Sequence, residues 1–117
     1  MSETSKLHPW LKREMKKRYG VEQSYTKKTP GRYSSRKGIS DFIFCVRGLY
    51  IAIEVKVLDN YETNMQKDFL NITADAGGLS IVLHDKDKRV FDVIDKWIEL
   101  YGLPKDCGRV LRIRLGQ

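Results

Sequence analysis

Long hydrophobic runs are absent from this sequence, and no apolar stretch approaches the roughly 20 residues that a membrane-spanning helix needs. The opening residues, MSETSKLHPW, lack the apolar segment of a secretory signal peptide. Cysteine occurs only twice, at Cys45 and Cys107, without the clustered spacing of a metal site. We therefore expect a cytoplasmic protein with reduced thiols and no membrane segment.

The composition that remains is that of a folded domain. Of the 117 residues, 41% are hydrophobic and 32% are charged, which excludes a disordered chain. That length suits one domain with a real core and is too short for two. We expect a single domain over residues 1–117.

Positive charge is concentrated in the N-terminal third. Between Lys6 and Lys37, eleven basic residues face only Glu14 and Glu22, so this third exceeds the net charge of +7 for the whole chain. Such a segment fits contact with a phosphate backbone, although a solvated basic face is the alternative. The residues assigned to nucleic-acid contact are Lys12, Lys16, Lys27, Lys28, Arg32, Arg36 and Lys37.

Three segments have the apolar spacing of helices. The first spans 9–19, with Pro9 in its first turn and Gly20 after its end. The second spans 63–76 and the third 90–101. The apolar face expected for the second comprises Met65, Phe69, Ile72 and Ala76.

Strand-like runs occupy 39–46 and 49–57, and the two-residue gap Arg47-Gly48 predicts a tight hairpin. Residues 79–84 are almost wholly apolar, as in a strand buried on both sides. The tail at 109–116 contains VLRIRL, whose alternation predicts a strand at a sheet edge or a subunit contact. The order α-β-β-α-β-α defines an α/β fold, in which the second strand crosses through a helix to the third.

The hairpin turn fixes which residues face each other. With Arg47-Gly48 as the turn, Asp41 faces Glu54, and Lys56 lies on the same face two residues along. The opposite face is wholly apolar and is expected to form the core: Phe42, Phe44, Val46, Ile51, Ile53, Val55 and Val57.

Two carboxylates directly across a hairpin destabilise it unless one is protonated or a cation lies between them. Mg²⁺ binds through one or two carboxylates with water and phosphate oxygens, which the Asp41–Glu54 pair would supply. The Lys56 ammonium could then stabilise a phosphorane or position the attacking water. The alternative is a solvated polar face on which Lys56 pairs with Glu54.

For two further residues, the sequence alone favours a role outside the site. Glu14 is best explained as a partner of Arg18, four residues along the helix. Gln66 is adjacent to the apolar stripe of its helix, and the sequence alone predicts a solvated side chain. His8 and His84 stand isolated in the sequence and carry little weight as catalytic residues.

Asp41 closes the string KGISD, and Glu54-Val55-Lys56 follows after one hairpin. In this order and spacing the chain resembles the PD-(D/E)xK nuclease superfamily, and within it the stand-alone phage and bacterial VRR-NUC group. The resemblance covers about residues 8–98. It departs from the commoner pattern at Ser40, where proline is usual, and the N-terminal helix has no clear V-R-R segment. Archaeal-type Holliday junction resolvases share the same order of motifs.

The resemblance implies a PD-(D/E)xK-like core, with a small mixed sheet and flanking helices. It also implies an Mg²⁺-dependent deoxyribonuclease, with Mn²⁺ as a substitute, that leaves 5′-phosphate ends in a bacterial or phage-infected cell. The expected substrate is branched DNA such as a Holliday junction, cut by a homodimer. The alternatives are a monomeric nicking or flap nuclease and a non-catalytic nucleic-acid-binding module. The implied metal ligands are Asp41, Glu54, the Val55 carbonyl and Glu14, with Lys56 as catalytic lysine and Gln66 as accessory residue.

Overall fold

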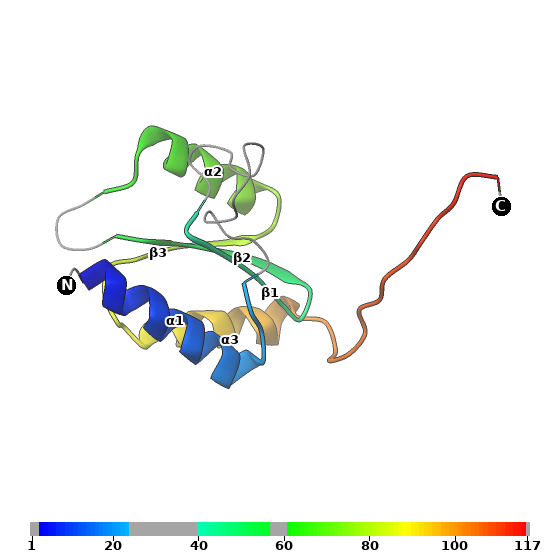
Figure 1. Cartoon of the computed structure of the whole chain (residues 1–117), viewed down its shortest axis with the longest axis horizontal. Coiled ribbons are helices and arrows are strands. Elements are labelled where there is room, and N and C mark those ends of the chain that lie inside the picture. The colour runs from blue at the N-terminus through cyan, green and yellow to red at the C-terminus, as the bar shows by residue number, and fades with distance from the viewer. Residues whose placement is uncertain (1–2, 24–39, 57–60, 117) are drawn as a thin grey trace.

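A computed structural model of the chain describes residues 3–23, 40–56 and 61–116. It has the expected α/β order (Figure 1). Within the described residues, no helix has the length and apolarity to cross a membrane. The elements are α1 (Glu3–Tyr19), β1 (Phe42–Val46), β2 (Leu49–Val55), α2 (Asn64–Asp75), β3 (Leu79–Leu83) and α3 (Arg89–Tyr101).

The three described strands form a small mixed sheet in the order β1-β2-β3. β1 and β2 are antiparallel, and β2 and β3 are parallel because α2 crosses between them. Val46 pairs with Leu49, as the predicted turn requires. Arg47 and Gly48 both have positive φ, 53° and 81°, as the residues of a type I′ hairpin turn do. The predicted hairpin and its register are therefore confirmed.

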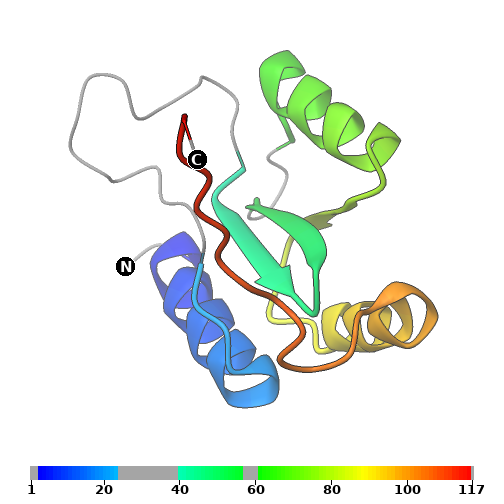
Figure 2. The same cartoon turned by 90° about the vertical axis from the view of Figure 1, so that its right-hand side faces the viewer.

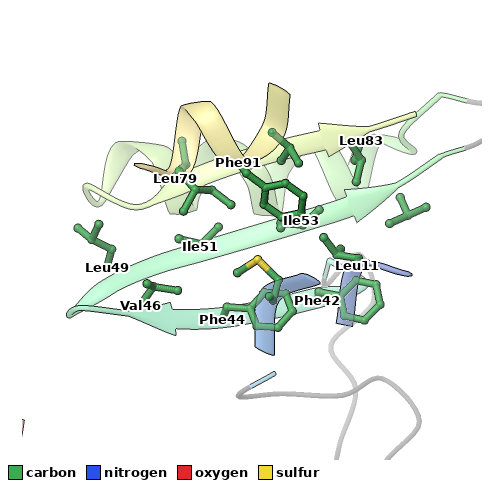
Figure 3. Packing of buried hydrophobic residues seen from close by; sticks show 14 of the residues in the cluster. Leu11, Phe42, Phe44, Val46, Leu49, Ile51, Ile53, Leu79, Leu83 and Phe91 are labelled. Atoms are coloured by element: carbon green, nitrogen blue, oxygen red, sulfur yellow. The ribbon is translucent and has the colours of Figure 1, made fainter. Parts of the chain in front are cut away.

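Helices cover both faces of the sheet (Figure 1): α1 and α3 lie on one face and α2 on the other. The main core lies between the sheet and the helices α1 and α3 (Figure 3). A smaller cluster joins Ile43 and Ala52 to Phe69 and Leu70 on the opposite face. The apolar hairpin face expected from the sequence enters the main core through Phe42, Phe44, Val46, Ile51, Ile53 and Val55, whereas Val57 lies outside the described residues.

α1 begins earlier than predicted, at Glu3, so Pro9 lies inside the helix and not in its first turn. The missed signal is Leu7, which is buried with Leu11 and Met15 at successive four-residue steps. Burial of this stripe against the sheet outweighs the helix-breaking tendency of proline.

α2 is rotated relative to the prediction. Its buried residues are Phe69, Leu70 and Thr73, whereas Met65 and Ile72 are 52% and 54% exposed. The reason is the partner surface: Phe69 and Leu70 pack against the sheet residues of the smaller cluster. This rotation brings the side of the helix that carries Gln66 toward the sheet, because positions 66, 69, 70 and 73 share one helix face.

Two predictions about strands are not met within this chain. Residues 110–115 form no strand at the edge of the sheet, because no described strand lies beside them to supply hydrogen bonds, and they run exposed to solvent. The alternative for this tail, a subunit contact, stays a prediction. β3 lies at the edge of the three-stranded sheet, with Ser80, Ile81 and Val82 only partly buried, so it is not buried on both sides. The first residue of the predicted hairpin, 39, and its last residue, 57, lie outside the described residues.

Candidate active site

Asp41 and Glu54 meet at the open end of the β1–β2 hairpin. They occupy facing positions one step beyond the last ladder pair, Phe42 with Ile53. The Asp41 backbone N–H donates to Glu54 Oε2 at 3.1 Å, and the Val55 N–H donates to Asp41 Oδ2 at 2.9 Å. Each carboxylate therefore holds the backbone of the other strand, and the predicted opposition of the two acids is confirmed.

The Glu54 carboxylate lies in the protein interior, where its side chain is 2% exposed. Besides the Asp41 N–H, it accepts a hydrogen bond from Gln66 Nε2 at 2.8 Å and lies 3.7 Å from Lys56 Nζ. Burial of a carboxylate is costly unless such donors and charges surround it. Two hydrogen bonds and one ion pair therefore hold Glu54 in one position.

Gln66 joins α2 to this cluster. Its Oε1 accepts from the Thr63 N–H at 2.9 Å, and its own N–H donates to Thr63 Oγ1 at 3.2 Å, which together form a capping box. The same side chain donates through Nε2 to Glu54. The residues alone suggested a solvated glutamine, because the buried face of α2 was assigned to the wrong residues.

Lys56 follows the end of β2, and its side chain is 18% exposed. Its backbone N–H donates to Leu83 O at 3.0 Å, so the residue is anchored to β3. Since backbone groups alternate along a strand, the Val55 N–H and C=O point the other way, toward Asp41. The Val55 N–H does bond there, and its carbonyl shares that direction.

One site residue was missed by the sequence reasoning. His8 of α1 places Nε2 3.7 Å from Asp41 Oδ2, and its ring meets Phe42 edge-on with centroids 4.9 Å apart. Its sequence neighbours gave no sign of this, because the contact depends on the angle at which α1 crosses the sheet. The only available signal was its place beside the buried Leu7.

The structure does not bring Glu14 to the pair of carboxylates. Its Oε1 accepts from Arg18 Nε at 3.1 Å, the intrahelical pairing that the residues alone favoured. Glu14 lies six residues after His8, or about 9 Å along the helix axis and on another face. The helix residue next to Asp41 is therefore His8.

The donor set determines which metal would fit. Within the described part of the chain, no three His, Cys, Asp or Glu side chains form a metal-binding group. Two carboxylates and a backbone carbonyl are nevertheless enough for Mg²⁺, which keeps several waters and takes few protein ligands. The residues fit a hydrated hard cation and do not fit a tightly enclosed structural metal such as zinc.

Two of the predicted nucleic-acid-binding residues are described. Lys12 and Lys16 follow His8 at four-residue steps on α1 and line a hollow beside Phe44 and Glu22. Lys16 Nζ lies 3.1 Å from Glu22 Oε1. The other five residues lie outside the described ranges: Lys27, Lys28, Arg32, Arg36 and Lys37.

Comparison of the chain with models of known protein families, with curated proteins and with solved structures finds no match. The resemblance drawn from the motifs therefore stays a prediction, and the functional argument depends on the geometry of this cluster.

Proposed function

We propose that the chain is a metal-dependent nuclease that hydrolyses phosphodiester bonds in DNA. The observation that carries the proposal is the opposition of Asp41 and Glu54 at the end of the hairpin, with Lys56 3.7 Å from Glu54. This combination of two acids and an ammonium is what metal-assisted phosphoryl chemistry uses to hold a cation and stabilise negative charge.

Asp41, Glu54 and the Val55 carbonyl would hold Mg²⁺, or Mn²⁺ in its place. When bound, the ion supplies positive charge next to the scissile phosphate and lowers the pKa of a bound water. Lys56 would donate to a phosphate oxygen or to the attacking water. Gln66 would keep the Glu54 carboxylate in place, since it bonds Oε1 at 2.8 Å.

A purely structural role for the two acids is the main competing explanation. Both accept backbone N–H groups, and these bonds extend the strand pairing. A neutral side chain with one oxygen could do the same without opposing two negative charges. The energetic cost of a second carboxylate, almost fully buried, therefore favours a site that binds a cation.

A path for the DNA backbone leads away from the carboxylates along α1. His8, Lys12 and Lys16 lie in one row, spaced by about 6 Å along the axis, and His8 contacts Asp41. Two lysines in line with the carboxylates suit a chain of phosphates. Because each protomer carries one site, cutting both strands of a branched substrate needs a two-fold partner, and we propose a homodimer acting on branched DNA.

The proposal is tested by cleavage of a four-way junction, a flap and a linear duplex, with Mg²⁺, with Mn²⁺ and with a chelator. The Lys56→Ala variant should lose about 100-fold or more in cleavage rate and keep most of its affinity for DNA. Lys67→Ala is the matched control, because it removes an exposed lysine from α2. Cleavage by Lys56→Ala at the wild-type rate would overturn the mechanism.

The same assay separates the alternatives. Preference for the flap or single nicks by a monomer would support the nicking or flap nuclease. Retention of DNA without cleavage under either metal would support a non-catalytic binding module.

A further inference from the structure

The last residues of the chain expose an unusual amount of apolar surface. We call 109–116 the C-terminal arm. Val110, Leu111, Ile113 and Leu115 are 77%, 73%, 86% and 104% exposed. The chain leaves the body past the β1–β2 turn (Figure 1), where the Leu103 N–H donates to Arg47 O at 2.8 Å. Beyond this anchor the arm extends into solvent.

The alternation of the arm gives an extended strand two different faces. Leu111, Ile113 and Leu115 would lie on one face, and Arg112 and Arg114 on the other. A strand of this kind is stable only when a sheet supplies hydrogen bonds and a surface for its apolar face. In the described part of the chain no strand pairs with the arm, and its apolar side chains stay exposed.

β3 offers a free edge of matching character. Because Lys56 N–H bonds Leu83 O, the backbone groups of Ser80 and Val82 point away from β2. Within the described sheet no strand pairs with that side. A hollow of about 320 Å³ borders it, and its apolar lining includes Ile81, Val90 and Val93. Val93 is 48% exposed, Ile81 is partly buried and Val90 is buried, so the uncovered part of this surface is centred on Val93.

Charge favours β3 over the other edge, whereas length suits both, since β1 and β3 each have five residues. The six residues 110–115 span about 20 Å when extended, and the five residues of β3 span about 17 Å. Figure 2 shows the β3 side flanked by α2 and α3, whereas β1 lies beside α1. α1 carries six basic and two acidic residues, and α3 carries two basic and three acidic residues. The net positive charge of the arm, which contains three arginines, is therefore repelled by α1 and not by α3, without any direct ion pair between the arm and α3.

We propose that the C-terminal arm of one copy adds as an edge strand to β3 of a second copy, with its apolar face over Ile81, Val90 and Val93. A two-fold axis makes the exchange reciprocal, so two arms and two edges are covered at once. Each exposed edge, which is an aggregation hazard when bare, is thereby paired. The inference goes beyond the proposed chemistry and does not depend on it.

The test measures the mass of the full chain in solution by sedimentation, without DNA or metal. The wild type should sediment at twice 13.6 kDa. The double variant Leu111→Asp/Ile113→Asp should raise the dimer dissociation constant about 100-fold or more, because two apolar side chains lose their burial. Val93→Asp, on the receiving surface, should do the same. The control Arg112→Ser/Arg114→Ser changes the other face of the arm and should leave a dimer.

Amide hydrogen exchange locates the contact. Ser80 and Val82 should be protected in the dimer and lose that protection in Leu111→Asp/Ile113→Asp. A wild type that is monomeric at every concentration would overturn the inference. Dimers of unchanged stability in both Leu111→Asp/Ile113→Asp and Val93→Asp would overturn it as well. Loss of DNA retention without change of mass would instead assign the arm to nucleic-acid contact. Failure of DNA cleavage with intact dimers would overturn only the proposed function.

Discussion

Glu54 is a charged residue in a position that normally belongs to a core side chain. It is 1% exposed, and its strand neighbours Ile53 and Val55 are buried in the main core. Two hydrogen bonds and the ion pair with Lys56 compensate for its burial, yet Asp41 lies opposite with a second negative charge. A folded protein tolerates such an arrangement when a function requires it, and the requirement proposed here is a cation.

The Asp41→Asn variant tests this conflict between stability and function. Asn keeps an oxygen for the Val55 N–H but removes one of the facing charges. With a chelator present, its free energy of unfolding should therefore equal that of the wild type or exceed it by up to about 1 kcal/mol. Denaturant unfolding measures this difference. Mg²⁺ at about 100 times its Kd should stabilise the wild type by about 2.7 kcal/mol and leave Asp41→Asn unchanged.

Asp68→Asn, at an exposed position of α2, is the control for this experiment and should keep the full Mg²⁺ effect. If Asp41→Asn were stabilised by Mg²⁺ as strongly as the wild type, the carboxylate pair would not be the cation site.

At this scale the sequence was informative where geometry is local. The two-residue turn determines the pairing of every residue in the hairpin, so the opposition of Asp41 and Glu54 followed directly. His8 and the inward position of Gln66 did not follow, because each depends on how a helix is rotated against the sheet. That rotation is set by packing of residues distant in sequence, such as Phe69 against Ala52.

The hairpin turn and the root of the C-terminal arm form one structural element. An added Cβ at Gly48 would lie 2.6 Å from Leu103 Cδ1, and Gly48 also has a φ of +81°. Gly48→Ala therefore combines backbone strain with displacement of Leu103. We expect a loss of about 2 kcal/mol in the free energy of unfolding, measured by urea denaturation.

Gly20→Ala separates the two contributions. Its φ is +68°, and nothing lies within 4 Å of the added Cβ, so it should cost only about 1 kcal/mol. Equal losses in the two variants would show that Leu103 does not hold the arm against the turn.

The elements themselves were largely predictable. The predicted bounds of α2, α3, β2 and β3 lie within two residues of the observed ones, whereas α1 begins six residues earlier than predicted and β1 three residues later. The arm at 110–115 has a strand's alternation but no described partner strand, so its pattern did not produce a strand here. Alternation encodes a preference, and hydrogen bonds from a neighbouring strand are needed to satisfy it.

Charge differs between the two helices that cover one face of the sheet. α1 is strongly basic and flanks the candidate site through His8, whereas α3 on the other side of the same sheet face carries more acids than bases. Tyr19 joins the two helices, since its hydroxyl donates to Asp95 Oδ1 at 2.7 Å; burial first, and this bond second, raise its pKa above the ordinary tyrosine value. A polyanion should therefore approach from the α1 side, where the row of lysines leads to the carboxylates.

This approach predicts which lysines contribute to the salt dependence of DNA binding. With a chelator present to prevent cleavage, the logarithm of the binding constant should fall linearly with the logarithm of the salt concentration. Lys12→Ser/Lys16→Ser should reduce the slope by about 1.8, because each lost phosphate contact releases about 0.9 counterion fewer. Lys86→Ser/Lys88→Ser removes the same charge from the exposed turn before α3 and should leave the slope nearly unchanged. Equal slopes for both double variants would mean that DNA does not follow α1, and that net charge alone attracts it.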